Sequence, residues 1–258
     1  MPKLFVMSDI HGFYDEMIEA LNKAGFDKDN SEHWVITCGD HFDRGPKPYE
    51  VMYYLKKLDR KILIKGNHEQ LFNECVERGY WYSHDMSNGT FDTICALGGA
   101  EEGRSFEECC VIAEQKAKVF FDKMVNYFET KSYVFCHSWI PVNFEGWDLS
   151  EYSKRPKKYS KKEDWRYAHQ SEWDSAMWLN PLNMAMDGFG IEKSIVSGHW
   201  HCSYGHHLES IKTYDWISEF GKDACFDPYY YKDKLIMIDG CTAHTGKVNV
   251  LVLEDEFI

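Results

Sequence analysis

The sequence has 258 residues, of which 44% are hydrophobic and 16% aromatic, enough for one large domain with a sizeable buried core. Its formal net charge of −13 argues against stable binding to nucleic acid or to an anionic membrane. No apolar run approaches the ~18 residues of a membrane span. Only residues 4–7 are apolar before Ser8, too few for a secretory leader. The nine cysteines fit neither a disulfide framework nor a zinc finger, so we expect a cytoplasmic protein.

The first third of the chain alternates between short apolar runs and helical patterns. Strands are predicted at residues 4–7, 34–37 and 62–64, which are rich in Val, Ile and Leu. Helices are predicted at residues 13–24 and 48–58, where apolar residues recur every three or four positions. This βαβαβ order predicts a parallel sheet flanked by helices.

The middle of the chain has a different character. Residues 71–130 read mostly as helix and loop, and residues 144–190 are polar, aromatic and irregular. We expect both segments to form a cap inserted into a single domain that spans residues 1–258. The remaining strands are predicted at residues 133–136, 194–197, 234–238 and 247–253.

Polar clusters follow the first two predicted strands. Asp9 and His11, at i and i+2, lie on the same side of an extended segment, although a simple strand-end turn would also explain them. Asp40 in the second cluster is suited to bridging two metals, and Arg44 offers a planar fork for phosphate oxygens. In open α/β sheets, sites form beyond the carboxyl ends of the strands, so these clusters are candidates for one site.

Three later clusters complete this candidate site. Asn67 supplies a hard oxygen ligand, and the adjacent His68 can donate a proton to a leaving oxygen. His137 ends another predicted strand, and His199 and His201 follow the next one. A lone histidine at a strand end is more often structural, but one binuclear metal site accounts for all five clusters together.

The order of these motifs, D-x-H, G-D-x-x-D-R-G, G-N-H-E, H and G-H-x-H, resembles the calcineurin-like metallophosphoesterase superfamily. The second and third motifs look like its phosphoprotein phosphatase branch, which includes phage-type bacterial Ser/Thr phosphatases and symmetrical diadenosine tetraphosphatases. Residues 87–90 with Thr93, and residues 238–241, also resemble segments of that branch. The resemblance implies an α/β fold, an αββα sandwich of two mixed sheets flanked by helices, with a helical and irregular cap.

The resemblance also implies a role for each motif residue. The expected metal ligands are Asp9, His11, Asp40 as the bridge, Asn67, His137, His199 and, as a further ligand of the first metal, His201. The expected catalytic residues are His68 as general acid, Asp43 as its orienting partner, and Arg44 as the phosphate ligand. The substrate would contact Arg44, Asn67 and His68. Hydroxide held between two divalent ions would attack phosphorus. The mixed ligands suit Mn, with Fe or Zn as alternatives.

Two features bear on the substrate. Relatives carry a second phosphate-binding arginine in a W-x-R segment, where this chain has Leu179 or Asn180, so Arg166 or a lysine would have to substitute. A basic run at residues 154–162 is either a solvated loop or a positive lip that attracts a phosphorylated substrate.

We therefore predict a two-metal phosphoester hydrolase. A Ser/Thr or dual-specificity phosphoprotein phosphatase is favoured, with phosphorylated proteins or peptides as partners. The alternative is a symmetrical dinucleoside polyphosphate hydrolase acting on nucleotides, towards which Trp200, beside His199, points. A metal-binding module without turnover is the remote alternative.

Overall fold

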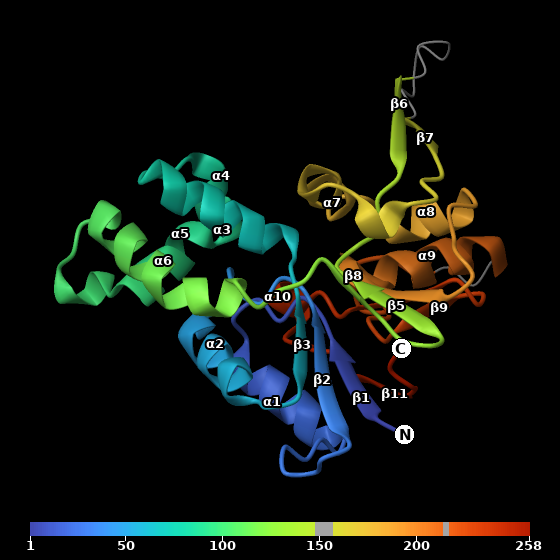
Figure 1. Cartoon of the computed structure of the whole chain (residues 1–258), viewed down its shortest axis with the longest axis horizontal. Helices are drawn as coiled ribbons and strands as arrows, with labels where there is room; N and C mark the ends of the chain where they lie inside the picture. The colour runs from blue at the N-terminus through green and yellow to red at the C-terminus, as the bar shows by residue number, and fades with distance from the viewer. Residues whose placement is uncertain (148–156, 214–216) are drawn as a thin grey trace.

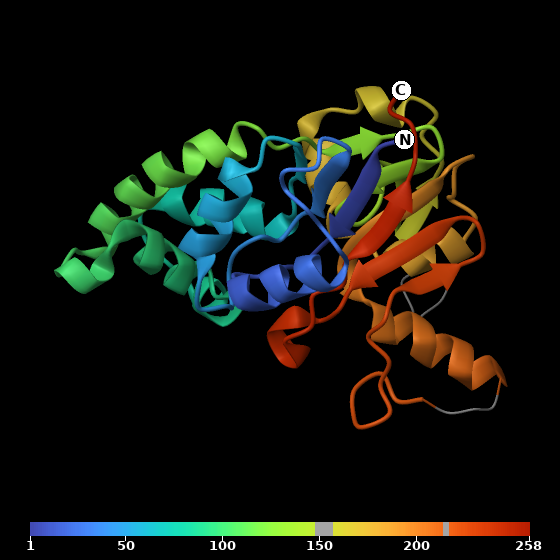
Figure 2. The same ribbon diagram turned by 90° about the horizontal axis from the view of Figure 1, so that it is seen from below.

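The computed structural model describes residues 1–147, 157–213 and 217–258. Two mixed sheets face each other at its centre (Figure 1). The first sheet has the order β11-β1-β2-β3. Strands β1, β2 and β3 are parallel, and β11 pairs with β1 as an antiparallel edge strand. Its strands are β1 (Lys3–Met7), β2 (His33–Cys38), β3 (Lys61–Ile64) and β11 (Leu251–Glu254). The pairing of β1 with β11 brings the two ends of the chain together (Figures 1 and 2).

The second sheet has a parallel centre and two antiparallel edges, in the order β4-β5-β8-β10-β9. Its strands are β4 (Tyr127–Glu129), β5 (Tyr133–Cys136), β8 (Ser194–His201), β9 (Tyr229–Tyr231) and β10 (Leu235–Asp239). Because the central strands of both sheets are parallel, the carboxyl ends of β5 and β8 form one edge, as those of β1 and β2 do in the first sheet.

An apolar layer lies between the two sheets. Leu4, Val6 and Ile36 of the first sheet belong to one buried cluster with Phe135 and Val196 of the second. These strands are buried on both faces, which explains why they read as continuous apolar runs in the sequence. Each fully buried aliphatic side chain of this kind contributes roughly 1.5–3 kcal/mol to folding.

Helices cover the outer face of the first sheet and extend beyond it. Met17 and Leu21 of α1 pack in one cluster with Phe5 and Val35 of the sheet, and Figure 2 shows α1 lying along this face. The same cluster continues into a lobe of four helices, α3 to α6, on the left of Figure 1. The helices of this side are α1 (Tyr14–Lys23), α2 (Pro48–Lys57), α3 (Asn67–Arg78), α4 (Ser83–Asn88), α5 (Thr90–Gly98) and α6 (Phe106–Phe121), with the short turn η1 (Ala100–Glu102).

The outer face of the second sheet is covered by shorter elements. Trp173 of α7 and Leu182 of α8 pack in one cluster with Val134, Ile195 and Leu235 of the sheet. A two-stranded hairpin, β6–β7, projects from this side (Figure 1). The elements of this side are β6 (Asn143–Trp147), β7 (Lys157–Ser160), η2 (Trp165–Tyr167), α7 (Gln170–Ala176), α8 (Pro181–Met186) and α9 (Cys202–Thr213), and α10 (Thr242–Thr245) precedes β11. The predicted αββα sandwich is confirmed.

Several boundaries differ from the sequence-based expectation. The last strand was expected at residues 247–253 but covers only Leu251–Glu254. Within residues 247–250, the Asn249 side chain makes the contacts instead: its Nδ2 donates to the carbonyls of Phe226 and Ile238. The helix α9 was not expected, because its buried residues are small, including Ser203 and Gly205, and give no apolar period. The segment 144–190, expected to be irregular, contains the hairpin and two helices.

None of the helices in the described ranges has the length and apolar character that crossing a membrane would require. The single domain with two cap segments stays a prediction. In the structure, the four-helix lobe shares its apolar core with the first sheet, as an extension of the sandwich.

Candidate active site

The motif residues gather where the strands of both sheets end. Asp9 and His11 follow β1, Asp40 follows β2, and His137 follows β5, while His199 lies at the end of β8. Asp9, His11, Asp40 and His137 are almost fully buried. Residues that are up to 190 positions apart in the chain therefore come into contact, as in the 3.0 Å hydrogen bond from the His199 backbone nitrogen to Asp9 Oδ2.

Two groups of potential metal ligands share the carboxylate of Asp40. One consists of His11, Asp40 and His68, and the other of Asp40, His137 and His199, with the ligand atoms of each group within 4.8 Å of one another. His11 Nε2 lies 3.8 Å from Asp40 Oδ2, and His137 Nε2 lies 3.5 Å from Asp40 Oδ1. The two oxygens of Asp40 thus face different imidazoles, so this carboxylate lies between the two groups and could bridge two ions.

Asn67 belongs to the second group. Its Oδ1 lies 2.7 Å from His137 Nε2 and 3.1 Å from His199 Nδ1. Asn67 is the first residue of α3, directly after the loop that follows β3. The structure therefore brings together the four side chains expected at the second metal: Asp40, Asn67, His137 and His199.

The first group differs from its expected membership. His68, expected as the general acid, joins it, with Nε2 3.9 Å from Asp40 Oδ2. Asp9 is not a member of this group, and its Oδ2 accepts hydrogen bonds from the Ser8 hydroxyl and from the backbone nitrogen of His199. His201 lies in neither group found among the described residues; its Nε2 is 3.9 Å from Asp239 Oδ2.

The close approach of the two sheets here depends on a glycine. A Cβ built on Gly198 would lie 1.8 Å from Ser8 Oγ and 2.0 Å from Asp9 Oδ2. Any side chain would push β8 away from the end of β1. The ligand loops themselves are strained, because Asp9, His11 and Asp40 all have φ near +50°.

Glu69 fixes the loop that carries Asp40. Its buried carboxylate accepts hydrogen bonds from the backbone nitrogens of Gly66 (2.7 Å), Asp40 (3.1 Å) and His41 (2.9 Å). Burial opposes ionisation, but the adjacent His41 outweighs it and lowers the pKa of Glu69. The G-N-H-E motif indicated that Glu69 could cap the following helix, as its bond to the Gly66 backbone nitrogen does, but not that it would also hold the Asp40 loop.

His68, Asp43 and Arg44 form a second hydrogen-bonded unit beside Asp40. His68 Nδ1 lies 2.7 Å from Asp43 Oδ2, which also accepts a hydrogen bond from the Thr90 hydroxyl at 2.7 Å. The Arg44 guanidinium donates to the Nε2 atoms of His11 (2.8 Å) and His68 (3.1 Å). The structure therefore places all three expected catalytic residues in contact with one another.

Electrostatics favour the protonation states that bind cations. Burial lowers the pKa of His11 and of His199 to about 3, so both imidazoles are neutral at pH 7. Burial alone would raise the pKa of Asp40, but the imidazoles of His137, His68 and His11 lower it instead. Neutral imidazoles, an ionised carboxylate and an amide oxygen are the donor forms that divalent transition metals take. The residues present therefore fit two such ions.

His68 behaves differently from these ligands. Burial tends to lower its pKa, but the carboxylates of Asp40 and Asp43 outweigh burial and raise it. A histidine that holds a proton near neutral pH is suited to general acid catalysis.

Three further residues lie at the site, and the sequence gave neither Asp239 nor Phe220 a role. Asp239 is buried behind Asp9, and burial, followed by the charge of Asp9, raises its pKa well above the usual range. The rings of Trp178 and Phe220 lie edge-on to His199 and His201, at centroid distances of 6.1 and 5.6 Å. Contacts between segments so distant in sequence leave no local pattern.

The expected substitute for a second phosphate-binding arginine is engaged elsewhere. The Arg166 guanidinium donates to both oxygens of Glu129, at 2.8 and 2.6 Å. In the W-x-R position, the Leu179 carbonyl accepts a hydrogen bond from Ser138, and Asn180 caps α8 by accepting one from the Asn183 backbone nitrogen. Arg44 is thus the arginine that the described structure places beside the ligand groups.

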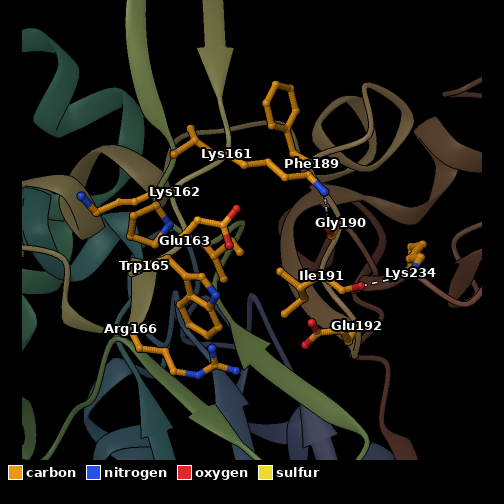
Figure 3. Close-up of a pocket in the computed structure, with 13 residues that line it drawn as sticks. Lys161, Lys162, Glu163, Trp165, Arg166, Phe189, Gly190, Ile191, Glu192 and Lys234 are labelled. Atoms are coloured by element: carbon orange, nitrogen blue, oxygen red, sulfur yellow. Dashed lines mark hydrogen bonds between the residues drawn. The ribbon is translucent and has the colours of Figure 1, made fainter.

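The basic run falls partly outside the described residues, which exclude Lys154 and Arg155. Lys161 and Lys162 line a separate pocket of about 360 Å³ that contains none of the expected ligands (Figure 3). There Lys161 donates to the Gly190 carbonyl at 3.2 Å, while Lys162 pairs with Glu172 at 3.0 Å. Both lysines are therefore engaged in contacts at this separate pocket and not beside the expected metal ligands.

Comparisons with known proteins agree with this geometry. A family model for the calcineurin-like phosphoesterase matches residues 2–203. A bis(5'-nucleosyl)-tetraphosphatase PrpE [asymmetrical] of Halalkalibacterium halodurans is 24% identical over 65% of this chain and 74% of its own length. The Bacillus velezensis protein of that name is 40% identical over 24% of this chain, and the match spans only 29% of its own length. A symmetrical bis(5'-nucleosyl)-tetraphosphatase of Aliivibrio salmonicida is 36% identical over 25% of this chain and 23% of its own.

Solved structures share the fold along nearly the whole chain. A cold-active protein tyrosine phosphatase of a psychrophilic Shewanella species superposes with a TM-score of 0.51 and 17% identity, covering 98% of this chain and 76% of that one. A mutant cold-active protein tyrosine phosphatase gives a TM-score of 0.54 with the same identity and coverage. On its motifs, its fold and the family match, the chain belongs to the calcineurin-like phosphoesterase family.

Proposed function

We propose that this protein hydrolyses phosphoesters with the help of two divalent metal ions. The observation that carries the proposal is the shared Asp40: each of its oxygens faces its own set of ligands, and the His68–Asp43–Arg44 unit lies beside it. The first ion would be held by Asp9, His11 and Asp40, with His201 as a further ligand, and the second by Asp40, Asn67, His137 and His199. When bound, two such ions polarise the phosphoryl group and supply a nucleophile at neutral pH.

Arg44 is positioned to bind the substrate phosphate. Its guanidinium already lies between His11 and His68, and its fork geometry matches two phosphate oxygens. By binding the phosphate, Arg44 would stabilise the charge that develops on its oxygens. In turning towards the phosphate, the Arg44 guanidinium would also leave Nε2 of His68.

His68 is proposed as the general acid. Its Nδ1 donates to Asp43, which fixes the ring. Nε2 accepts from Arg44 in this structure and would carry the second proton once Arg44 binds the substrate phosphate. The neighbouring carboxylates raise its pKa, so that proton is retained until the leaving oxygen takes it. Asp43 orients the imidazole and is itself held by Thr90.

For the substrate, we propose a dinucleoside polyphosphate. The names of the sequence relatives support this class, as do the exposed rings of Trp178 and Phe220 beside the two histidines of the G-H-x-H motif. A Ser/Thr or dual-specificity phosphoprotein phosphatase is the second candidate, supported by the branch-type motifs around Asp40 and Asn67. Manganese as the native metal and the cytoplasmic location stay predictions.

The test is manganese-dependent hydrolysis of diadenosine tetraphosphate, a phosphoserine peptide and a generic aryl phosphate. Rapid cleavage of the dinucleotide with little turnover of the peptide is the expected result. The opposite preference would move the assignment to the phosphoprotein phosphatases. Inactivity on all three, with two metal ions bound per chain, would contradict the proposed hydrolase and favour a binding module.

A further inference from the structure

An exposed tryptophan joins the candidate metal centre to a neighbouring cavity. The indole of Trp178 is 48% exposed and lies edge-on to the ring of the proposed ligand His199, at 6.1 Å and 86°. It follows α7 and also lines a cavity of about 290 Å³ between α7 and the β6–β7 hairpin. A group bound in this cavity would therefore lie next to the second set of metal ligands.

The cavity is lined chiefly by flat and apolar side chains. Phe144 and Tyr159 of the hairpin contribute rings 5.7 Å apart, facing the same space as Trp178. The volume lies just below the range of about 300–1,000 Å³ that is typical of small-molecule sites. It suits one planar group better than a whole dinucleotide.

Two polar side chains in the lining distinguish between possible occupants. Glu172 is paired with Lys162 and accepts from the His169 backbone nitrogen, yet a carboxylate has about four acceptor positions. The Ser175 hydroxyl donates to the Ser171 carbonyl, which leaves its oxygen as an acceptor. A carboxylate repels phosphate but accepts from the amino group of a base, so the lining combines stacking surfaces with acceptors, as nucleobase sites do.

We propose that this cavity binds the nucleobase of a nucleoside polyphosphate while its phosphates reach the metal centre, with Trp178 as the stacking platform. The inference rests on the proposed function, because it names a substrate contact of the same site. It assigns Trp178 as a specificity-determining residue. Adenine is the base that we would test first, since its exocyclic amino group matches the acceptors Glu172 and Ser175.

The experiment measures equilibrium binding of AMP and of ribose 5-phosphate to the manganese-loaded protein by calorimetry. Trp178→Ala should weaken AMP binding about tenfold, which corresponds to ~1.4 kcal/mol, and leave ribose 5-phosphate binding unchanged. Trp178→Phe keeps a ring and should retain most of the affinity for AMP. Trp81→Ala is the matched control, because Trp81 is 43% exposed and lies in the four-helix lobe, away from the cavity lining.

Equal losses for both ligands, or no loss for either, would overturn the proposal. So would a Trp178→Ala variant that binds AMP normally but has a higher KM for the phosphoserine peptide, because the cavity would then hold a peptide side chain. The proposed function is judged separately, by turnover of the wild type. If the wild type binds AMP through Trp178 but hydrolyses no phosphoester, the proposed base site stands and the proposed hydrolase function is wrong.

Discussion

A Cβ built on Gly89 would lie 2.2 Å from the backbone nitrogen of Arg44. Gly89 joins α4 to α5 with φ +84°, and the neighbouring Thr90 donates a hydrogen bond to Asp43. The four-helix lobe therefore meets the loop that carries Arg44 at a point where only glycine fits. This contact makes the position of Arg44 dependent on a segment about 45 residues later in the chain.

We expect Gly89→Ala to lower kcat/KM by about 100-fold, because a displacement of about 1 Å at a catalytic group costs that much. Gly103→Ala is the control, since Gly103 has φ +80° but a Cβ there would meet nothing within 4 Å. Gly103→Ala should lose roughly 1–2 kcal/mol of unfolding free energy to backbone strain, measured in urea, and Gly89→Ala should lose more, because its Cβ must also displace the Arg44 backbone. Equal activities in the two variants would show that the contact with Arg44 does not position it.

His68→Asn should lower kcat by about 10²- to 10⁴-fold, the usual contribution of a general acid. Metal content, measured by elemental analysis, should stay at the wild-type value, because His68 is not one of the proposed ligands. A His68→Asn protein that loses one of its two ions would instead make His68 a ligand, as its place beside His11 and Asp40 would allow.

Metal removal should destabilise the protein as well as inactivate it. With manganese at 100 times its Kd, binding to the folded state alone adds ~2.7 kcal/mol, so chelation should lower Tm and manganese should restore it. Asp40→Asn should abolish the manganese-dependent rise in Tm, whereas Asp15→Asn, at an exposed Lys47 ion pair, should leave it intact. Full occupancy of both sites in Asp40→Asn would refute the bridging role.

Glu129 gives a prediction for stability against pH. Hydrogen bonds from Arg166 and Lys193, which outweigh burial, lower the pKa of Glu129 from 4.5 to about 2. A carboxyl group with a lowered folded-state pKa stabilises the fold above its unfolded pKa, and this contribution disappears as the pH falls from about 4.5 to about 2.

Glu129→Gln should therefore cost about 1 kcal/mol of unfolding free energy at pH 7 and only a small part of that at pH 2, measured by denaturant titration. Glu114→Gln, on the exposed face of α6, should be neutral at both values. A cost for Glu129→Gln that did not change with pH would mean that the side chain acts through packing and not through its charge.

The sequence predicted the site better than the connections around it. Asp9, Asp40 and His137 stood out as candidates because each lies within two residues of the end of an apolar run, and parallel strands bring their carboxyl ends to one edge. By contrast, β8 continues to His201, and its register with β10 shifts between Met237 and Asp239. This shift places Asp239 beside His201, and no feature of the local sequence encodes it.

The cavity beside Trp178 was invisible in the sequence for a related reason. Its rings come from the hairpin and from the segment after α7, and neither segment shows a strand or helix period strong enough to predict. The four-helix lobe was predicted as helix and loop, but its shared core with the first sheet depends on long-range packing. Local patterns thus defined the elements and motifs, and tertiary contacts defined their surroundings.

The wide spacing of the proposed ligands has a consequence for synthesis. They run from Asp9 to His201, and the site closes only when β8 pairs with β5, which lies about 60 residues earlier. On the ribosome, the β1–β3 half carries Asp9, His11, Asp40 and Asn67 long before His137 and His199 are made. The proposed ligand set is therefore complete only after the second sheet has docked, and an arrested nascent chain that ends before β8 lacks His199 and His201.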